Sequence, residues 1–214
     1  FSFRNKTEID KAIENIKDKK FDITDIASKV VNRNPSGPFT TSTLQQVASS
    51  RLGFGASRTM QIAQRLYQGI EIDGETIGLI TYMRTDGTNL SADAITDFRD
   101  YIKSEYGKEY LPDSPLNYSG KKAKNAQEAH EAIRPTDINR SPESIKKYLS
   151  TDQQKLYNLI WGRALSSQME TAKFDRNTIT ITSKDGGTIC KTSGSVLKFE
   201  GYLKVFPSPN KDDD

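Results

Sequence analysis

The residues best suited to chemistry lie in the short segment from Thr81 to Asn89. This segment carries a tyrosine, Tyr82, and an arginine two positions later, Arg84. A phenol is a weak nucleophile while protonated, because its ordinary pKa is about 10, and a nearby cation favours the tyrosinate. A guanidinium also matches phosphate oxygens and stabilises their charge in a phosphoryl-transfer transition state. The pair therefore has the chemistry that phosphoryl transfer from DNA to protein requires.

The spacing of Tyr82 and Arg84 allows the two side chains to act together. In an extended chain, residues i and i+2 project from the same side, so both would face one phosphate. Spacing alone favours a plainer alternative, in which Tyr82 ends a strand with its hydroxyl at the surface and Arg84 is solvated. Both interpretations stay open at this point.

A second group of reactive residues precedes Pro135. It contains Glu128, Glu131 and the only histidine of the chain, His130. A histidine can donate a hydrogen bond to a phosphate oxygen or move a proton near neutral pH, although a lone histidine is more often structural. Three ligands at this spacing on a helix converge poorly, and the sequence has no HExxH arrangement, so a metal site is not favoured.

Basic residues with aromatic neighbours form a third group. Arg58 and Arg65 lie seven positions apart and therefore share a helix face, close to Tyr67. A lysine-rich run, Lys121–Lys124, follows Tyr118. Phosphate contacts combined with base stacking are the usual way to hold a single strand. Taken alone, these charges also fit a solvated helix face.

Composition limits the class of protein. The chain has 214 residues, of which 31 are Lys or Arg and 28 are Asp or Glu, so the net charge is +3. A hydrophobic content of 34% supports one or two folded domains, and full disorder is not expected. No apolar run approaches about 18 residues, which excludes a membrane-spanning helix, and the single Cys190 excludes a disulfide framework. The net charge is too small to decide for or against a nucleic-acid partner.

The two ends of the sequence carry no targeting signal. The chain begins at Phe1 without a signal-like apolar segment and closes on the acidic run Asp212–Asp214. We therefore expect an internal piece of a larger protein, with the cytoplasm as its default location.

Apolar residues at helical spacing predict a mostly helical centre. Each predicted helix follows a residue that caps helices well, and Ala126–Ile133 has helical propensity besides. The capping candidates are Thr7, Thr40–Thr43, Ser57, Ser91, Ser141 and Thr151.

Period-two patterns predict strands on both sides of this centre. Phe21–Val31 is the first such segment, and a β-rich tail begins at Phe174 and continues through Tyr202 and Val205. We expect the two flanks to pair in one small β-domain, with the helical part as an insertion.

Within the centre, Ile70–Ile77 has the pattern of two short strands around Asp73 and Gly74, a strong hairpin signal. Two helices followed by a hairpin outline a winged helix, a module that often binds DNA. A generic helix pair with a loop fits this outline equally well.

Three motifs taken together are highly specific. Pro38–Gln46, Gly78–Asp86 and Gln127–Pro135 occur in this order and resemble the bacterial type IA DNA topoisomerases, the topoisomerase I family. The flanks also resemble that family, down to Phe199–Tyr202. One difference is Gly87, which stands where the family motif often has Ser.

The resemblance implies an α+β fold, mainly α with flanking β. A helical, winged-helix-like domain that carries the active-site tyrosine is inserted between segments of a β-rich arch domain. Residues 1–38 and 169–214 would form the arch, and residues 39–168 would form the tyrosine domain.

The resemblance also implies roles for individual residues. Tyr82 would attack a phosphodiester of single-stranded DNA, form a 5′-phosphotyrosyl link and free a 3′-hydroxyl. Arg84 would position and neutralise the scissile phosphate, and His130 would hydrogen-bond the DNA backbone nearby. Further residues expected to contact DNA or shape the loop are Thr81, Asp86, Arg134 and Arg58.

The family relaxes negative supercoils by passing a strand through the break. It needs no ATP, because the phosphotyrosyl ester conserves the bond energy. Its acidic, Mg²⁺-binding domain has no counterpart in this sequence, so Mg²⁺ is expected to bind outside this chain, and the isolated chain is expected to be inactive. The implied partners are a single-stranded segment of negatively supercoiled DNA and the missing domains of the same polypeptide, with no membrane.

Other identities stay open beside this one. A sibling enzyme, topoisomerase III or the topoisomerase half of reverse gyrase, would differ in the domains outside this sequence. A noncatalytic winged-helix module that binds DNA would tolerate loss of the Tyr82 hydroxyl. A purely structural domain would also tolerate loss of Arg84 and His130.

Overall fold

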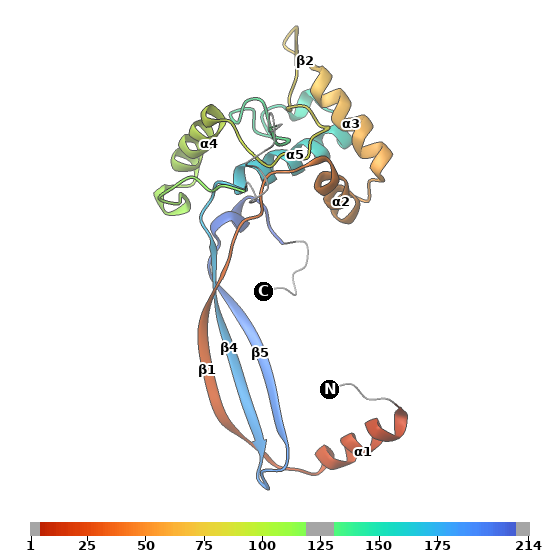
Figure 1. Cartoon of the computed structure of the whole chain (residues 1–214), viewed down its shortest axis with the longest axis vertical. Helices are drawn as coiled ribbons and strands as arrows, with labels where there is room; N and C mark the ends of the chain where they lie inside the picture. Colours follow the sequence, from red (N-terminus) through yellow and green to blue (C-terminus); the bar gives the residue numbers. More distant parts are fainter. Residues whose placement is uncertain (1–4, 119–130, 209–214) are drawn as a thin grey trace, which may run out of the picture. The chain divides into compact units, whose positions relative to one another are not determined.

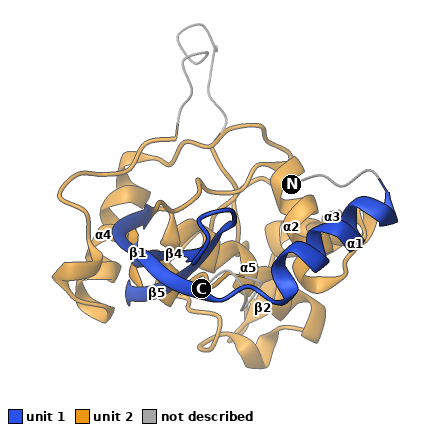
Figure 2. Cartoon of the chain, turned by 90° about the horizontal axis from the view of Figure 1, so that it is seen from below, with its two compact units in different colours: residues 1–32, 173–199, 214 blue, residues 33–172, 200–213 orange. Residues whose placement is uncertain are grey.

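The computed structural model describes residues 5–118 and 131–208. The chain divides into two compact units (Figure 2). Unit 1 consists of residues 1–32, 173–199 and 214, and unit 2 of residues 33–172 and 200–213, with the undescribed residues left aside. Five α-helices and two small sheets make up most of the regular structure of the described residues, which confirms the α+β class.

Unit 1 contains one helix and one three-stranded sheet. Helix α1 (Lys6–Lys17) is followed by β1 (Phe21–Arg33), and the other two strands are β4 (Ala172–Ser183) and β5 (Ile189–Phe199). The strand order is β1-β4-β5, and β4 pairs antiparallel with β5 (Figure 1). The sheet therefore joins the two flanks of the sequence, as expected.

The beginning of α1 differs from the prediction. The helix is capped by Asn5, whose side-chain oxygen accepts a hydrogen bond from the Glu8 backbone N–H at 3.0 Å. Thr7, the predicted cap, lies inside the first turn. Asparagine caps helices at least as well as threonine, so the cap moved two residues upstream.

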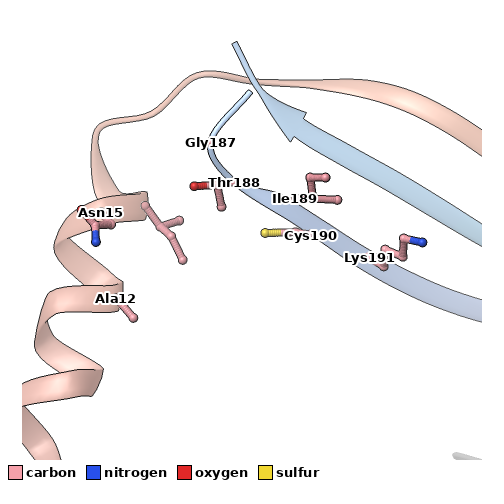
Figure 3. Close-up of a pocket in the computed structure, with 8 residues that line it drawn as sticks. Ala12, Asn15, Gly187, Thr188, Ile189, Cys190 and Lys191 are labelled. Carbon is pink, nitrogen blue, oxygen red and sulfur yellow. The ribbon is translucent and has the colours of Figure 1, made fainter. Parts of the chain in front are cut away.

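An open cavity of about 580 Å³ lies between α1 and the beginning of β5. Figure 3 shows Ala12 and Asn15 on α1, with Thr188 and Cys190 on the facing strand segment. The sulfur of Cys190 points toward α1 in this view. The helix buries none of its residues, so the apolar side of α1 is left largely uncovered by the described chain.

Unit 2 begins with a helix pair. Helix α2 (Thr41–Leu52) opens with a capping box between Thr40 and Thr43 and ends at Gly53, which adopts the left-handed φ of 68°. Helix α3 (Ala56–Gln68) follows Gly55 without a side-chain cap. The prediction that Ser57 caps α3 was therefore wrong, because Ser57 already lies in the first turn.

A hairpin follows the helix pair, as predicted. Strand β2 (Ile70–Ile72) pairs antiparallel with β3 (Glu75–Ile77). Asp73 and Gly74 between them have φ values of 49° and 91°. Positive φ at both central residues is the type I′ geometry that matches the twist of paired strands.

Two more helices complete unit 2, α4 (Ala92–Glu105) and α5 (Thr151–Ser166). The predicted helix after Ser141 does not form. Its residues make turns and a short 3₁₀ segment, Lys146–Tyr148, because Ser141 accepts hydrogen bonds from the Ser144 backbone and hydroxyl. Such local bonds compete with a helix this short. None of the helices in the described residues is long and apolar enough to cross a membrane.

The core of unit 2 surrounds α5, which contacts both α2 and α3. A helix that is buried on most of its sides is a central core element, and α5 is of this kind. The largest fully buried side chains of this core are Tyr157, Phe39, Phe98, Leu44, Leu66, Leu79, Ile80, Met83, Ile102, Ile133 and Leu156.

The β-rich tail ends earlier than the sequence predicted. A 3₁₀ segment, Gly201–Lys204, replaces the strand expected at Tyr202 and Val205. Gly201 has a φ of 49°, and a Cβ there would lie 2.4 Å from the Glu170 carbonyl oxygen, so the turn requires glycine. Beyond it, Phe206 enters the core of unit 2.

Candidate active site

The loop that carries Tyr82 alternates between exposed and buried side chains. Tyr82 is 49% exposed and Arg84 is also exposed, whereas Met83 and Thr85 are buried at 1% and 8%. Met83 anchors the loop in the core. The alternation projects Tyr82 and Arg84 from the side of the loop opposite to the anchors.

The first motif holds this loop from one side through Thr41, at the N-terminus of α2. The backbone N–H of Thr41 donates to the Thr85 carbonyl at 2.9 Å, and the Thr85 N–H donates to the Thr41 hydroxyl at 2.8 Å. The same hydroxyl lies 2.7 Å from the Met83 carbonyl oxygen, to which it donates. The backbone on both sides of Arg84 is therefore fixed by one threonine.

The third motif holds the loop from the other side. Thr81 exchanges two hydrogen bonds with Arg134: its N–H donates to the Arg134 carbonyl at 2.9 Å, and its hydroxyl accepts from the Arg134 N–H at 3.0 Å. The Thr81 hydroxyl donates to the Ala132 carbonyl at 2.7 Å. The Ile133 N–H donates to the Phe39 carbonyl at 2.9 Å, which links the third motif to the first.

These contacts also correct a prediction. Glu131 and Ile133 make bridges between extended segments, so the helical propensity assigned to Ala126–Ile133 is not realised at its described end. The competing interactions are tertiary: the backbone groups of this segment pair with neighbouring loops, which satisfies them without a helix.

Arg134 is held within the frame of the site. Its side chain forms an ion pair with Glu131 at 2.6 Å and donates to the Pro135 carbonyl at 3.0 Å. Glu131 in turn accepts a hydrogen bond from the Ser91 N–H at the start of α4. Burial alone would raise the pKa of the Glu131 carboxyl, but the hydrogen bonds from Arg134 and Ser91 outweigh it and hold this pKa below its ordinary value.

The exposed side of the loop faces α3. The rings of Tyr82 and Tyr67 meet edge to face, with centroids 5.4 Å apart and planes at 64°. Arg84 lines an open groove of about 620 Å³ together with residues of α3, including Arg65. Asp86, also predicted as a site residue, is exposed beyond the buried Thr85.

One predicted site residue of the described structure, Arg58, lies away from this groove. Arg58 pairs with Asp152 of α5 at 2.6 Å, and its guanidinium lies 4.6 Å from the centroid of the Phe54 ring. It does not line the groove beside Arg84. His130 lies outside the described residues, as does Lys121–Lys124.

Sequence reasoning missed the role of Thr41 and the structural role of Glu131. Thr41 stands inside the first motif, so the motif itself was the available signal. Glu131 was weighed only as a metal ligand. Within the described residues, no group of three or more His, Cys, Asp or Glu side chains comes together in a way that could hold a metal ion.

The fold and the three motifs define the class of protein. A family model described as DNA topoisomerase matches residues 1–214, and the chain belongs to this DNA topoisomerase family. The resemblance of the motifs is thereby confirmed.

Individual relatives agree with this assignment. The chain is similar to DNA topoisomerase 1 of Rickettsia felis, with 48% identity over 206 residues, and to DNA topoisomerase 1 of Escherichia coli strain K12, with 45% identity over 210 residues. Full-length topoisomerase I from Thermotoga maritima has a similar structure, with a TM-score of 0.81 and 38% identity over 95% of this chain.

The chain spans about a quarter of the curated relatives that it matches. The matched regions cover 96% and 98% of this chain but 26% and 23% of the Rickettsia and Escherichia proteins. They cover 32% of the Thermotoga chain.

Proposed function

We propose that this chain is the part of an ATP-independent type IA DNA topoisomerase that forms the covalent bond to DNA. The Tyr82 oxygen attacks a phosphorus atom of single-stranded DNA. The bond from phosphorus to the 3′-oxygen breaks, the phenol loses its proton, and the leaving 3′-oxygen gains one. A 5′-phosphotyrosyl ester results, and the reverse reaction reseals the strand after strand passage, so that negative supercoils relax.

One observation carries this proposal: three motifs that are far apart in sequence meet around one loop, whose outward side chains include Tyr82 and Arg84. A loop fixed by buried anchors and hydrogen bonds holds its exposed groups in place before the substrate arrives. Such preorganisation is what electrostatic stabilisation of a phosphoryl-transfer transition state needs.

The remaining site residues take supporting parts in this proposal. Arg84 neutralises the scissile phosphate, and His130 donates a hydrogen bond to the DNA backbone. Thr81 and Arg134 fix the backbone before Tyr82, as their mutual hydrogen bonds indicate. Residues assigned to DNA contacts further from the cleaved bond are Asp86 and Arg58.

We assign the parts of the chain by the same proposal. Residues 39–168 form the tyrosine domain, and residues 1–38 and 169–214 belong to a β-rich arch. The succession of α2, α3 and the β2–β3 hairpin supports a winged-helix-like arrangement in the tyrosine domain.

Other components of the reaction lie outside this chain in our proposal. Mg²⁺ binds to another domain of the same polypeptide, no ATP is used, and the enzyme acts in the cytoplasm on the nucleoid. The isolated chain then binds single-stranded DNA weakly and does not relax supercoils.

The test is Tyr82→Phe in a full-length enzyme that carries this chain. The variant should lose covalent capture of labelled single-stranded DNA and still bind it noncovalently, because only the attacking oxygen is removed. Tyr101→Phe is the matched control, since its hydroxyl lies away from the loop on α4, and it should capture DNA normally. Undiminished capture by Tyr82→Phe would refute the proposal.

A further inference from the structure

The groove beside Arg84 is built on one face of α3. Its lining includes Ser57, Gln61, Gln64 and Gln68, which recur at i, i+4, i+7 and i+11 and so form one stripe along the helix. The opposite face of α3 carries the buried residues Thr59, Ile62, Ala63 and Leu66. The stripe is therefore presented to solvent by a helix that the core holds in place.

The groove has the chemistry of a nucleic-acid contact. Three glutamine amides each offer donors and an acceptor, which suit base edges as well as phosphate and sugar oxygens. Arg65 and Arg84 add two guanidiniums, and Met60 adds a polarisable apolar surface on which a base can pack.

Some guanidiniums of the same unit are neutralised by ion pairs within the described chain, whereas the two of the groove are not. Arg58, Arg134 and Arg140 each have an ion-pair partner. Arg65 and Arg84 have no ion-pair partner among the described residues, and no acidic side chain lines the groove. Two positive charges without local compensation favour a polyanion in this groove.

The groove is also continuous with the tyrosine. Tyr67, whose ring meets that of Tyr82, lies on the last turn of α3 between Gln64 and Gln68. The Tyr82 ring therefore lies at the end of the stripe where Gln64 and Gln68 stand.

We propose that the α3 groove binds the segment of single-stranded DNA on the 3′ side of the cleaved bond. This inference rests on the proposed function, because a 5′-phosphotyrosyl ester keeps that segment attached to Tyr82 while the other segment ends in a free 3′-hydroxyl. The groove gives the attached segment a binding surface on the same unit as the tyrosine. The broken DNA end therefore stays in position for the resealing reaction.

The length of the stripe sets the number of nucleotides involved. From Ser57 to Gln68 the helix rises by about 16 Å. At about 3.4 Å per stacked nucleotide, and more for an extended strand, this length accommodates roughly three to five nucleotides.

The test measures affinity for oligonucleotides that share one cleavage site but extend either one or six nucleotides beyond it on the 3′ side. The parent is a full-length Tyr82→Phe enzyme, which binds without cutting. Arg65→Ala should weaken binding of the long oligonucleotide about 5- to 10-fold and leave the short one unchanged. It should also reduce the slope of log K against log salt by about 0.7, because one phosphate contact is lost.

A matched control and a second variant sharpen the result. Arg176→Ala removes the same charge from an exposed position of unit 1 and should change neither affinity. The double variant Gln64→Ala with Gln68→Ala keeps the charge and should still reduce the preference for the long oligonucleotide several-fold.

The outcomes separate this inference from the proposed function. If the enzyme with Tyr82 intact forms its covalent adduct but Arg65→Ala binds long and short oligonucleotides as its parent does, the groove proposal is overturned alone. An equal loss for both lengths also overturns it. If no adduct forms at Tyr82, the proposed function fails and takes this inference with it.

Discussion

The two units of the chain use their apolar residues in opposite ways. Unit 2 buries them in a cluster around α5, and the loop of Tyr82 is anchored in that cluster through Met83. None of the described residues of unit 1 belongs to this cluster. Its exposed large apolar side chains include Ile9, Ile13, Ile16, Ile23, Ile26, Val30, Ile189, Val196 and Leu197.

The difference shows which unit of the molecule can hold side chains in a fixed geometry. A close-packed core resists displacement, so groups mounted on it keep their geometry. A three-stranded sheet with one uncovered helix gains little from burial and depends on its strand pairing for stability. The loop of Tyr82 is anchored in the unit that has the close-packed core.

The largest expected effect compares one isoleucine from each unit. Ile160 on α5 is fully buried, whereas Ile26 on β1 is 63% exposed. Ile160→Ala should lower the free energy of unfolding by about 2–5 kcal/mol, because it leaves a cavity in the core. Ile26→Ala should change it by less than about 0.5 kcal/mol.

Urea unfolding followed by the fluorescence of Trp161 measures this difference. Trp161 is the single tryptophan of the chain and is buried on α5, so its signal reports unit 2. Equal effects of the two substitutions would contradict the assignment of the core to unit 2.

A smaller effect is expected when one threonine hydroxyl is removed from each unit. The Thr41 hydroxyl forms hydrogen bonds with the backbone of the loop of Tyr82. The Thr24 hydroxyl is exposed and lies 2.9 Å from the Thr182 hydroxyl on the neighbouring strand. Thr41→Val keeps the shape of the side chain but removes the oxygen that accepts a hydrogen bond from the buried Thr85 N–H. This loss should lower the free energy of unfolding by about 1–3 kcal/mol.

The same variant should impair catalysis, because it releases the backbone next to Arg84. Relaxation of supercoiled DNA by a full-length enzyme should fall roughly 10- to 100-fold for Thr41→Val. Thr24→Val should relax DNA at the parental rate and lose less than about 0.5 kcal/mol of stability. Normal relaxation by Thr41→Val would show that the hydrogen bonds of the Thr41 hydroxyl do not position the loop of Tyr82.

The smallest effect concerns one carboxylate in each unit, Glu131 and Asp185. Glu131→Gln should cost about 1–2 kcal/mol at pH 7, since its partly buried pair with Arg134 is lost. The pKa of Glu131 is lowered in the folded protein, so its contribution is present above the ordinary value of about 4.3 and is lost as the pH falls through the lower folded value. Parent and variant should therefore converge in stability only when the pH falls below the lowered folded pKa of Glu131.

Salt should affect the ion pair of Asp185 in unit 1 more than that of Glu131 in unit 2. Hydrogen bonds from Ser183 and Lys19 lower the pKa of this exposed carboxyl. Salt screens exposed pairs much more than partly buried ones. At 1 M salt, opening of unit 1, measured by hydrogen exchange of the amides of its sheet, should no longer distinguish Asp185→Asn from the parent. The cost of Glu131→Gln should persist, and its disappearance in salt would place that pair at the surface.

Much of the architecture could be predicted from the sequence because local signals agreed with the fold. The hairpin followed from Asp73 and Gly74, and α2 followed from the capping residues around Thr40. The pairing of the flanks followed from their shared period of two. The motifs identified the loop and its family through residue types at fixed spacing.

The predictions that were wrong failed because contacts between segments distant in sequence decide the local structure. The turn at Gly201 depends on carbonyl groups of a distant segment, which no local pattern reveals. The extended course of Ala132 and Ile133 is set by the backbone carbonyls of Asn89 and Phe39, which are distant in sequence. The pairing of Arg58 with Asp152 requires two helices to meet, so spacing along α3 gave only its helix face.

The most direct measurement of the central claim is to locate the covalent bond itself. A full-length enzyme that carries this chain is denatured during its reaction with labelled single-stranded DNA and digested, and the labelled peptide is sequenced. We predict that the label stays on the peptide containing Tyr82 and is attached through the 5′-phosphate. A label on any other residue, or recovery of all DNA free of protein, would contradict the account.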